Sequence, residues 1–180
     1  MNISEIIKTR RSIFPKEFNG EVISDHIIEN LLKDAHQAPS HKLTFPWHFR
    51  IYKGASKINL LDYFISQQSD LLKKEKLQSQ KKQISHLILI SARFSGILPE
   101  VEEICATACA VQNIYLSLHQ YSNIGGYWST GNNVLSDKFK KHMGFENNET
   151  CLGYFILGKV NEKRTQASRL THESNVTWMQ

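Results

Sequence analysis

The sequence predicts an α+β fold in which helices pack against a modest sheet. Helix-like and strand-like segments are mixed along the chain, but strands rarely alternate with single helices as a doubly wound sheet requires. Two strongly apolar runs, HLILISARF at 86–94 and TCLGYFILGKV at 150–160, are also expected to be strands. The first is continuously apolar, which indicates a strand buried on both faces.

Length and composition predict one globular domain over residues 1–180. The chain is 41% hydrophobic and 22% charged, and no internal repeat or Gly/Ser-rich linker marks a boundary. No apolar run approaches the roughly 20 residues that a membrane span needs. The first residues, MNISEIIKTRRS, lack the basic-then-apolar layout of a secretory signal. We therefore expect a cytoplasmic protein without a membrane partner.

The N-terminal half is expected to hold three helices and one strand. Asn2 and Glu5 have capping-box spacing at the start of a first helix, which ends at Arg10. A second helix follows Ser24 and ends near Gln37, because a proline disfavours helical geometry in the residue before it. The remaining expected elements are a strand at 47–54 and a third helix at about 56–74.

The C-terminal half is expected to begin with a long, central helix. It follows Pro99, has acidic residues in its first turn, and ends at Gly125-Gly126. A short strand at 127–131 and a short helix capped by Ser136 come next, before the apolar strand at 150–160. The three cysteines, an odd number without metal-site spacing, are expected to be buried structural thiols: Cys105, Cys109 and Cys151.

The formal net charge of +5 suits an anionic ligand, a nucleic acid or an acidic surface without choosing among them. The densest basic stretch, KKEKLQSQKK at 73–82, has five lysines and one glutamate but no aromatic residues to stack on bases. A solvated helix or a mobile flap explains it better than a nucleic-acid-binding arm. We therefore expect no nucleic-acid partner, with a basic nucleic-acid-binding domain as the alternative from another class.

Three polar clusters are candidates for a binding site. Arg10-Arg11-Ser12 pairs two guanidinium groups with a hydroxyl, which suits a phosphate, although a solvated basic helix end is the simpler interpretation. APSHKLTFPWHF at 38–49 crowds polar side chains between a helix end and a strand, and its His41 could also be a packing residue. GGYWSTG at 125–131 allows close backbone approach to a flat or anionic ligand.

Together these motifs resemble the nitroreductase family of flavin-dependent oxidoreductases. The likeness rests on KTRRSIFPKEF, APSHKLTFPWHF, GGYWSTG and CLGYFILG, which span nearly the whole chain, and it is strongest to the minimal single-domain members. The resemblance implies a central, mostly antiparallel sheet flanked by helices, an intertwined homodimer, and one FMN in each of two clefts at the subunit interface. It also implies that a C-terminal tail, at about 165–180, reaches the partner subunit.

The resemblance further implies which residues bind FMN. The phosphate and ribitol would be held by Arg10, Arg11 and Ser12, and the remaining contacts would come from Gln37, His41, Trp128, Ser129 and Thr130. Minimal relatives often have arginine at the positions of Gln37 and Ser129, and many members have a basic residue at the position of Phe14. Each missing cation would weaken FMN binding, unless another lysine replaces it: Lys16, Lys42 or Lys159.

The implied reaction is a ping-pong exchange. NAD(P)H passes hydride through FMN to an electron-poor acceptor such as a nitroaromatic or quinone. No catalytic side chain is expected, because the sequence has no nucleophile elbow, HExxH motif or P-loop, and no metal site is expected either. The missing cations leave open an alternative, a flavin-binding or sensing protein on the same scaffold with little turnover.

Overall fold

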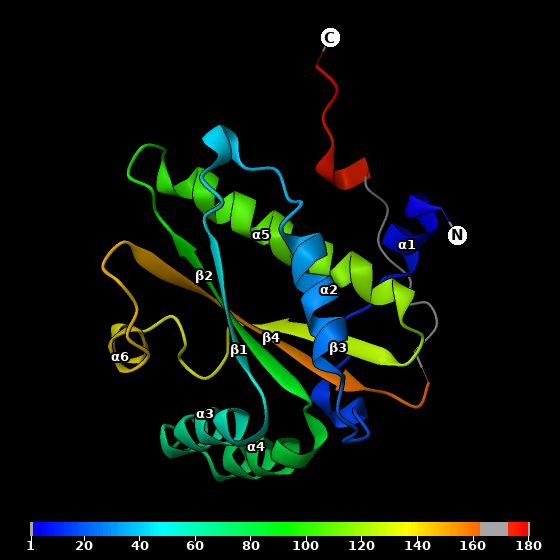
Figure 1. Cartoon of the computed structure of the whole chain (residues 1–180), viewed down its shortest axis with the longest axis vertical. Coiled ribbons are helices and arrows are strands. Elements are labelled where there is room, and N and C mark those ends of the chain that lie inside the picture. Colours follow the sequence, from blue (N-terminus) through cyan, green and yellow to red (C-terminus); the bar gives the residue numbers. More distant parts are fainter. Residues whose placement is uncertain (1, 163–172, 180) are drawn as a thin grey trace.

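The structure, a computed structural model, describes residues 2–162 and 173–179. Figure 1 shows the arrangement of the elements. The α-helices are α1 (Ile3–Thr9), α2 (Asp25–Ala35), α3 (Gly54–Ser66), α4 (Leu71–Gln83), α5 (Glu100–Ser117) and α6 (Asp137–His142). The strands are β1 (Trp47–Tyr52), β2 (His86–Arg93), β3 (Ile124–Ser129) and β4 (Glu149–Lys159). Short 3₁₀ turns are η1 (Pro15–Glu17), η2 (His41–Leu43), η3 (Leu118–Gln120) and η4 (Glu173–Asn175).

The four strands form one sheet in the order β1-β2-β4-β3, and every neighbouring pair is antiparallel. The register of β2 against β4 shifts where Ile90 pairs with Gly153 and Ser91 pairs with Cys151. Leu152 is therefore an extra residue in β4, as in a β-bulge. The antiparallel α+β sheet predicted from the sequence is confirmed.

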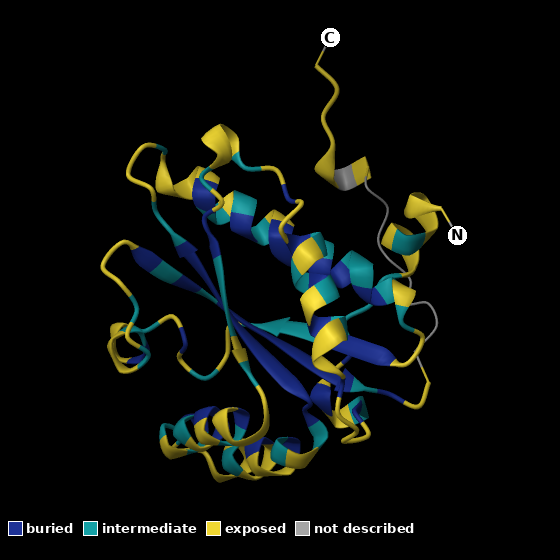
Figure 2. Ribbon diagram, viewed as in Figure 1, coloured by how far each residue is buried: buried dark blue, intermediate teal, exposed yellow. Residues whose placement is uncertain are grey.

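Helices cover both faces of the sheet, so the two central strands are buried on both sides (Figure 2). Side chains alternate between the faces along a strand. On β2, Ile88 and Ile90 pack in a core with α2 and α5, whereas Leu87 and Leu89 pack in a second core with α3, α4 and α6. This double burial explains the continuous apolar run at 86–94 that predicted the strand.

The single helix expected at 56–74 is in fact two helices, so that prediction was wrong. Helix α3 ends at Ser66, and Asp70 starts α4 by accepting hydrogen bonds from the N–H groups of Leu72 (2.9 Å) and Lys73 (3.3 Å). The lysine-rich stretch at 73–82 belongs to α4, which is anchored by the buried residues Leu77 and Gln80. The helical interpretation of that stretch is therefore confirmed.

Gly125 and Gly126 were expected to end the long helix, but they lie inside β3 instead. The helix ends earlier, at Ser117, and continues as η3. Both glycines are needed for packing, because a Cβ on Gly125 would lie 2.7 Å from the Cβ of Ile13 and a Cβ on Gly126 would overlap Phe155. Close packing, rather than a turn, explains this glycine pair.

The burial prediction for the cysteines was right for one of them and wrong for two. Cys151 is buried in β4, and burial raises the pKa of its thiol to about 11. Cys105 and Cys109 are exposed, because they lie on the side of α5 opposite the residues that meet the sheet. Those buried residues are Thr107, Ala110, Val111 and Ile114.

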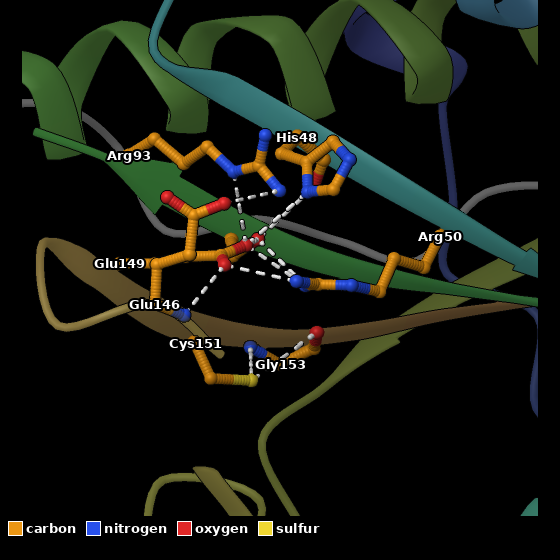
Figure 3. Close-up of polar contacts among 8 residues, drawn as sticks. His48, Arg50, Arg93, Glu146, Glu149, Cys151 and Gly153 are labelled. Atoms are coloured by element: carbon orange, nitrogen blue, oxygen red, sulfur yellow. Dashed lines mark hydrogen bonds and ion pairs between the residues drawn. The ribbon is translucent and has the colours of Figure 1, made fainter. Parts of the chain in front are cut away.

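A buried charged group stands at the start of β4 (Figure 3). Glu149 is fully buried and accepts hydrogen bonds from both terminal nitrogens of Arg50, at 2.8 and 2.9 Å, and from the Ser91 hydroxyl. His48 (3.2 Å) and Arg93 (3.6 Å) complete the group. Burial alone would raise the pKa of Glu149, but these hydrogen bonds outweigh it and lower the pKa to about 2. Glu149 is therefore an ionised carboxylate that joins β1, β2 and β4.

The C-terminal tail predicted at about 165–180 falls largely outside the described residues. Its described part, residues 173–179, contains η4 and an extended end that stands clear of the sheet (Figure 1). Three apolar side chains on it are exposed: Val176, Trp178 and Met179.

Candidate functional site

The segment that follows α1 lies directly against β3. Ile13 donates its backbone N–H to the carbonyl of Gly126 at 3.0 Å, and the missing side chain of Gly125 makes room for Ile13. This contact places Arg10 and Arg11 beside a small cavity of about 50 Å³ that also reaches His119. Thr9 Oγ1, at 2.9 Å from His119 Nε2, fixes the end of α1 to the end of the α5–η3 helix.

Tyr115 of α5 joins two of the predicted motifs. Its hydroxyl accepts a hydrogen bond from the Trp128 backbone N–H at 2.8 Å and lies 3.2 Å from Ser12 Oγ. The Arg10 guanidinium lies over its ring, 4.8 Å from the centroid. The Arg11 guanidinium turns back toward α1 and donates to the carbonyls of Lys8 (2.9 Å) and Arg10 (2.8 Å). The Arg-Arg-Ser motif and the tryptophan turn therefore share one region of the surface.

The turn after Trp128 is held by the bulge in β4. Trp128 Nε1 donates to the carbonyl of Leu152 at 2.8 Å. Gly153 has a φ of +104°, and a Cβ at this position would overlap the carbonyl oxygen of Ser129 and lie 3.2 Å from Thr130 Cγ2. Glycine is required here for its backbone conformation and for the close approach of the two strands.

A cavity of about 540 Å³ opens beside this turn. Phe14 and Tyr127 form an aromatic wall, with ring centroids 4.7 Å apart. The described residues that line it include no aspartate or glutamate; they are Phe14, Pro15, Lys16, Gln68, Lys73, Lys76, Leu77, Gln80, Tyr127, Ser129, Gly131, Asn132, Asn133, Tyr154 and Ile156. Such a surface fits a flat or anionic ligand.

Hydrogen bonds connect the cavity wall across three elements. Gln68, between α3 and α4, donates to Asn132 Oδ1 at 3.2 Å, and Asn132 Nδ2 donates to the Tyr154 hydroxyl at 2.7 Å. Asn132 and Asn133 both have left-handed backbones, with φ of 60° and 57°. Burial raises the pKa of Tyr154, so its hydroxyl stays neutral near pH 7.

Gln37 and His41 do not line the 540 Å³ cavity. His41 Nδ1 is 2.8 Å from Glu102 Oε2 at the start of α5, and Lys42 and Leu43 next to it have positive φ angles of 52° and 55°. Gln37 lines a groove of about 520 Å³ between α2 and β1, together with Trp47 and Phe49. Within one chain, the structure does not bring either residue to the cavity.

The two halves of the predicted site lie at opposite ends of α5 (Figure 1). Glu102 meets η2 at one end, whereas His119 meets α1 at the other. At about 1.5 Å of rise per residue, Glu102 and His119 are about 25 Å apart. The motifs around Arg10 and Trp128 are brought together, while the motif around His41 is held away from them.

The structure also distinguishes the lysines that could replace the missing cations. Lys16 lines the cavity, next to the aromatic ring of Phe14. Lys159 is 2.9 Å from Glu21 in an ion pair, and Lys42 belongs to η2 at the far end of α5. Of the three, only Lys16 is placed by this chain beside the predicted site.

Sequence reasoning missed several residues of this region. Tyr115 and Asn132 belong to no motif, and Tyr154 lies in the CLGYFILG motif without a predicted role, because their roles depend on contacts between distant segments. The cavity-facing lysines of α4 did carry a signal. Lys73, Lys76, Leu77 and Gln80 have the i, i+3, i+4, i+7 spacing of one helix face.

Neither a membrane-spanning helix nor a cluster of metal ligands is found among the described residues. None of the described helices combines the length and apolar character that a bilayer span requires. In the same residues, His, Cys, Asp and Glu side chains nowhere gather in groups of three or more that could hold a metal ion.

Comparisons with known proteins identify the family. A sequence model described as "Nitroreductase family" matches residues 7–159. The chain belongs to the nitroreductase family. The family resemblance drawn from the sequence motifs is therefore confirmed.

Individual relatives agree with this membership. The chain is 28% identical over 169 residues to a Bacillus subtilis protein named "Putative NAD(P)H nitroreductase YfhC", with 89% of this chain and 85% of that protein covered. A nitroreductase-like family protein from Bacillus cereus has the same fold, with a TM-score of 0.87, 20% identity, and coverage of 99% and 96%. A second structure, a Desulfovibrio desulfuricans "putative nitroreductase in complex with fmn", gives a TM-score of 0.80 at 17% identity, with coverage of 100% and 98%.

Proposed function

We propose that this nitroreductase-family chain is an FMN-dependent oxidoreductase that passes hydride from NAD(P)H to an electron-poor acceptor such as a nitroaromatic or quinone. The observation that carries the proposal is the 540 Å³ cavity, which is walled by aromatic and amide side chains, is free of carboxylates, and adjoins the Ser12–Tyr115–Trp128 contacts. Family membership supports it, as does the FMN named in the Desulfovibrio structure.

The residues in this region fit FMN. Arg10, Arg11 and Ser12 would hold its phosphate and ribitol, since paired guanidinium groups and a hydroxyl suit a phosphate. Ser129, which lines the cavity, would contact the ring system together with its neighbours Trp128 and Thr130. When bound, FMN supplies the hydride-accepting and hydride-donating chemistry. The protein's own part is to orient the cofactor and to admit the two substrates to one cavity in turn.

Tyr115 and Gly153 would position the binding groups without touching the cofactor. Tyr115 sets the spacing between Ser12 and Trp128, and Gly153 lets β4 approach Ser129 closely. Lys16 supplies positive charge at the position where Phe14 lacks it. This arrangement supports retention of FMN despite the departures at Phe14, Gln37 and Ser129.

We also propose a homodimer in which each cavity is completed by the partner subunit. About 25 Å separates the two ends of α5, so His41 of one chain cannot reach that chain's own Arg10. A second copy related by two-fold symmetry can supply it. The exposed apolar side chains of the tail, Val176, Trp178 and Met179, suit burial against that second copy.

A second candidate is a flavin-binding or sensing protein with little turnover. Glutamine, serine and phenylalanine stand at three positions where relatives often carry cations: Gln37, Ser129 and Phe14. For either function we propose a cytoplasmic location, because three free thiols suit a reducing compartment.

The test is an Arg10→Ala/Arg11→Ala double variant. Losing two charge-assisted hydrogen bonds should weaken FMN binding by about a hundredfold or more, because each is worth roughly 1.5–3 kcal/mol. Bound flavin is measured from the absorbance of purified protein, and NAD(P)H oxidation is measured with menadione or a nitrofuran. Lys82→Ala/Lys141→Ala removes the same charge at exposed positions outside both cavities and should keep its flavin.

The outcomes separate the candidates. Full flavin content in the arginine variant would refute the phosphate assignment. Wild-type protein that binds FMN but oxidises neither NADH nor NADPH with any acceptor would favour the sensing function. A colourless wild-type protein that cannot be loaded with FMN would refute both.

A further inference from the structure

One face of α4 points into the cavity. It consists of Lys73, Lys76, Leu77 and Gln80, which all line the 540 Å³ space. Leu77 and Gln80 are buried and fix the helix, whereas Lys73 and Lys76 are exposed. The two lysines lie one helical turn apart, at i and i+3. They form an exposed, positively charged edge of the cavity, next to the buried residues that anchor the helix.

The cavity carries three positive charges and no compensating negative charge from its described lining. Lys16 contributes the third ammonium group, from the segment after α1. Three other described lysines have carboxylate partners: Lys53 pairs with Asp25, Lys81 with Asp62, and Lys159 with Glu21. Within 4 Å, no carboxylate of the described residues pairs with Lys16, Lys73 or Lys76. A concave surface with one sign of charge concentrates ligands of the opposite sign.

We propose that Lys73 and Lys76, together with Lys16, bind an anionic group on a substrate of this cavity. The inference rests on the proposed function and names its substrate class. The shared chemistry is a phosphate monoester or a carboxylate. Its source is either the 2′-phosphate of NADPH or an acidic substituent on the electron acceptor.

The substrate, rather than the cofactor, is the partner that these lysines fit. FMN has a single phosphate, which the proposed function assigns to Arg10, Arg11 and Ser12 beside the other, smaller cavity. Exposed ammonium groups on flexible stems bind as mobile point charges, which suits a ligand that enters and leaves at each turnover.

The experiment compares a Lys73→Gln/Lys76→Gln variant with a Lys74→Gln/Lys82→Gln control. The control loses the same charge from the same helix at positions that do not line the cavity. Steady-state KM is measured for NADPH and NADH as donors, and for 4-nitrobenzoate and 4-nitrobenzamide as acceptors. Each pair differs mainly in one anionic group.

In the Lys73/Lys76 variant, the KM ratio of the anionic to the less anionic member should rise about five- to tenfold in one of the two pairs. A rise in the donor pair identifies the 2′-phosphate, and a rise in the acceptor pair identifies the carboxylate. The wild-type ratio should also increase with salt concentration. The control variant should keep the wild-type ratios.

Unchanged ratios in both pairs would overturn the proposal, as would an equal change in the control. Loss of bound flavin in the Lys73/Lys76 variant would also overturn it, since the lysines would then serve the cofactor. If the wild-type protein has no turnover, the proposed function fails separately. In that case the affinities of NADP⁺, NAD⁺ and 4-nitrobenzoate are measured by calorimetry. Equal affinities for wild type and for the Lys73/Lys76 variant would overturn the inference.

Discussion

At the scale of single residues, the site depends on side chains that connect motifs. Tyr115 lies in the last turn of α5, and its hydroxyl sets the distance between Ser12 and Trp128. Gly153 has a similar role in β4, where its positive φ and lack of a side chain let Ser129 and Thr130 pass close by. Neither residue binds the ligand in our proposal, but both determine where the binding residues lie.

Replacing Gly153 with alanine should therefore damage both stability and flavin binding. The left-handed backbone costs about 1 kcal/mol for a residue with a side chain, and the overlap with Ser129 raises the loss to about 3 kcal/mol. Urea unfolding and flavin titration measure the two effects. Gly144→Ala is the matched control, because Gly144 has a φ of +63° and open space around it. If the two variants lose equal stability, the packing argument for Gly153 is wrong.

Glu149 predicts a specific pH dependence. Its pKa of about 2 in the folded protein lies below the ordinary value of 4.5, so its stabilisation is complete above pH 4.5 and is lost as the pH falls toward 2. That shift corresponds to about 3 kcal/mol at neutral pH. Glu149→Gln should unfold at lower urea concentration at pH 7, and its stability should vary less than that of wild type between pH 4.5 and 2.

Glu146→Gln provides the control for this measurement. Glu146 is exposed and lies 3.5 Å from Arg93, so its removal should cost well under 1 kcal/mol. Parallel stability–pH curves for wild type and Glu149→Gln would show that the buried network does not act through the ionised carboxylate.

At the scale of elements, the boundary between α3 and α4 decides what the lysine-rich stretch does. Asp70 ends one helical pattern and starts another, and the new helix turns Lys73 and Lys76 toward the cavity. Gln68, which lies between the two helices, donates a hydrogen bond to Asn132, another residue that lines the cavity.

Replacing Asp70 with alanine should remove about 1 kcal/mol of stability, because the side chain caps two N–H groups of α4. Hydrogen exchange should accelerate in the first turn of α4. Ser24→Ala is a fitting comparison, since Ser24 occupies the N-cap of α2 without a side-chain cap hydrogen bond and its loss should cost only a few tenths of a kcal/mol. Equal losses would argue against the capping role of Asp70.

At the scale of the whole molecule, α5 separates the region around Arg10 from His41 by about 25 Å. In the proposed dimer, each complete site combines one end of α5 from one chain with the opposite end from its partner. The exposed thiols Cys105 and Cys109 lie on the side of this helix that faces away from the sheet.

Subunit mixing tests this arrangement. Neither Arg10→Ala/Arg11→Ala nor His41→Ala should bind FMN well as a homodimer. A mixed dimer has one site with both defects and one intact site, so random exchange should restore about a quarter of the full flavin content. Mixing the arginine variant with Ser12→Ala, a defect on the same half, should restore none. Absence of recovery in the first mixture would contradict the shared site.

The sequence by itself determined several of the elements and the family. Apolar runs marked β2 and β4, capping residues marked α1 and α6, and four motifs identified the nitroreductase family, because these signals depend on residues close together in the chain. Only the tertiary structure decided that Gly125 and Gly126 pack inside a strand, that Tyr115 joins Ser12 to Trp128, and that His41 stands apart from Arg10. These facts arise from contacts between segments tens of residues apart, and local spacing carries no information about such distances.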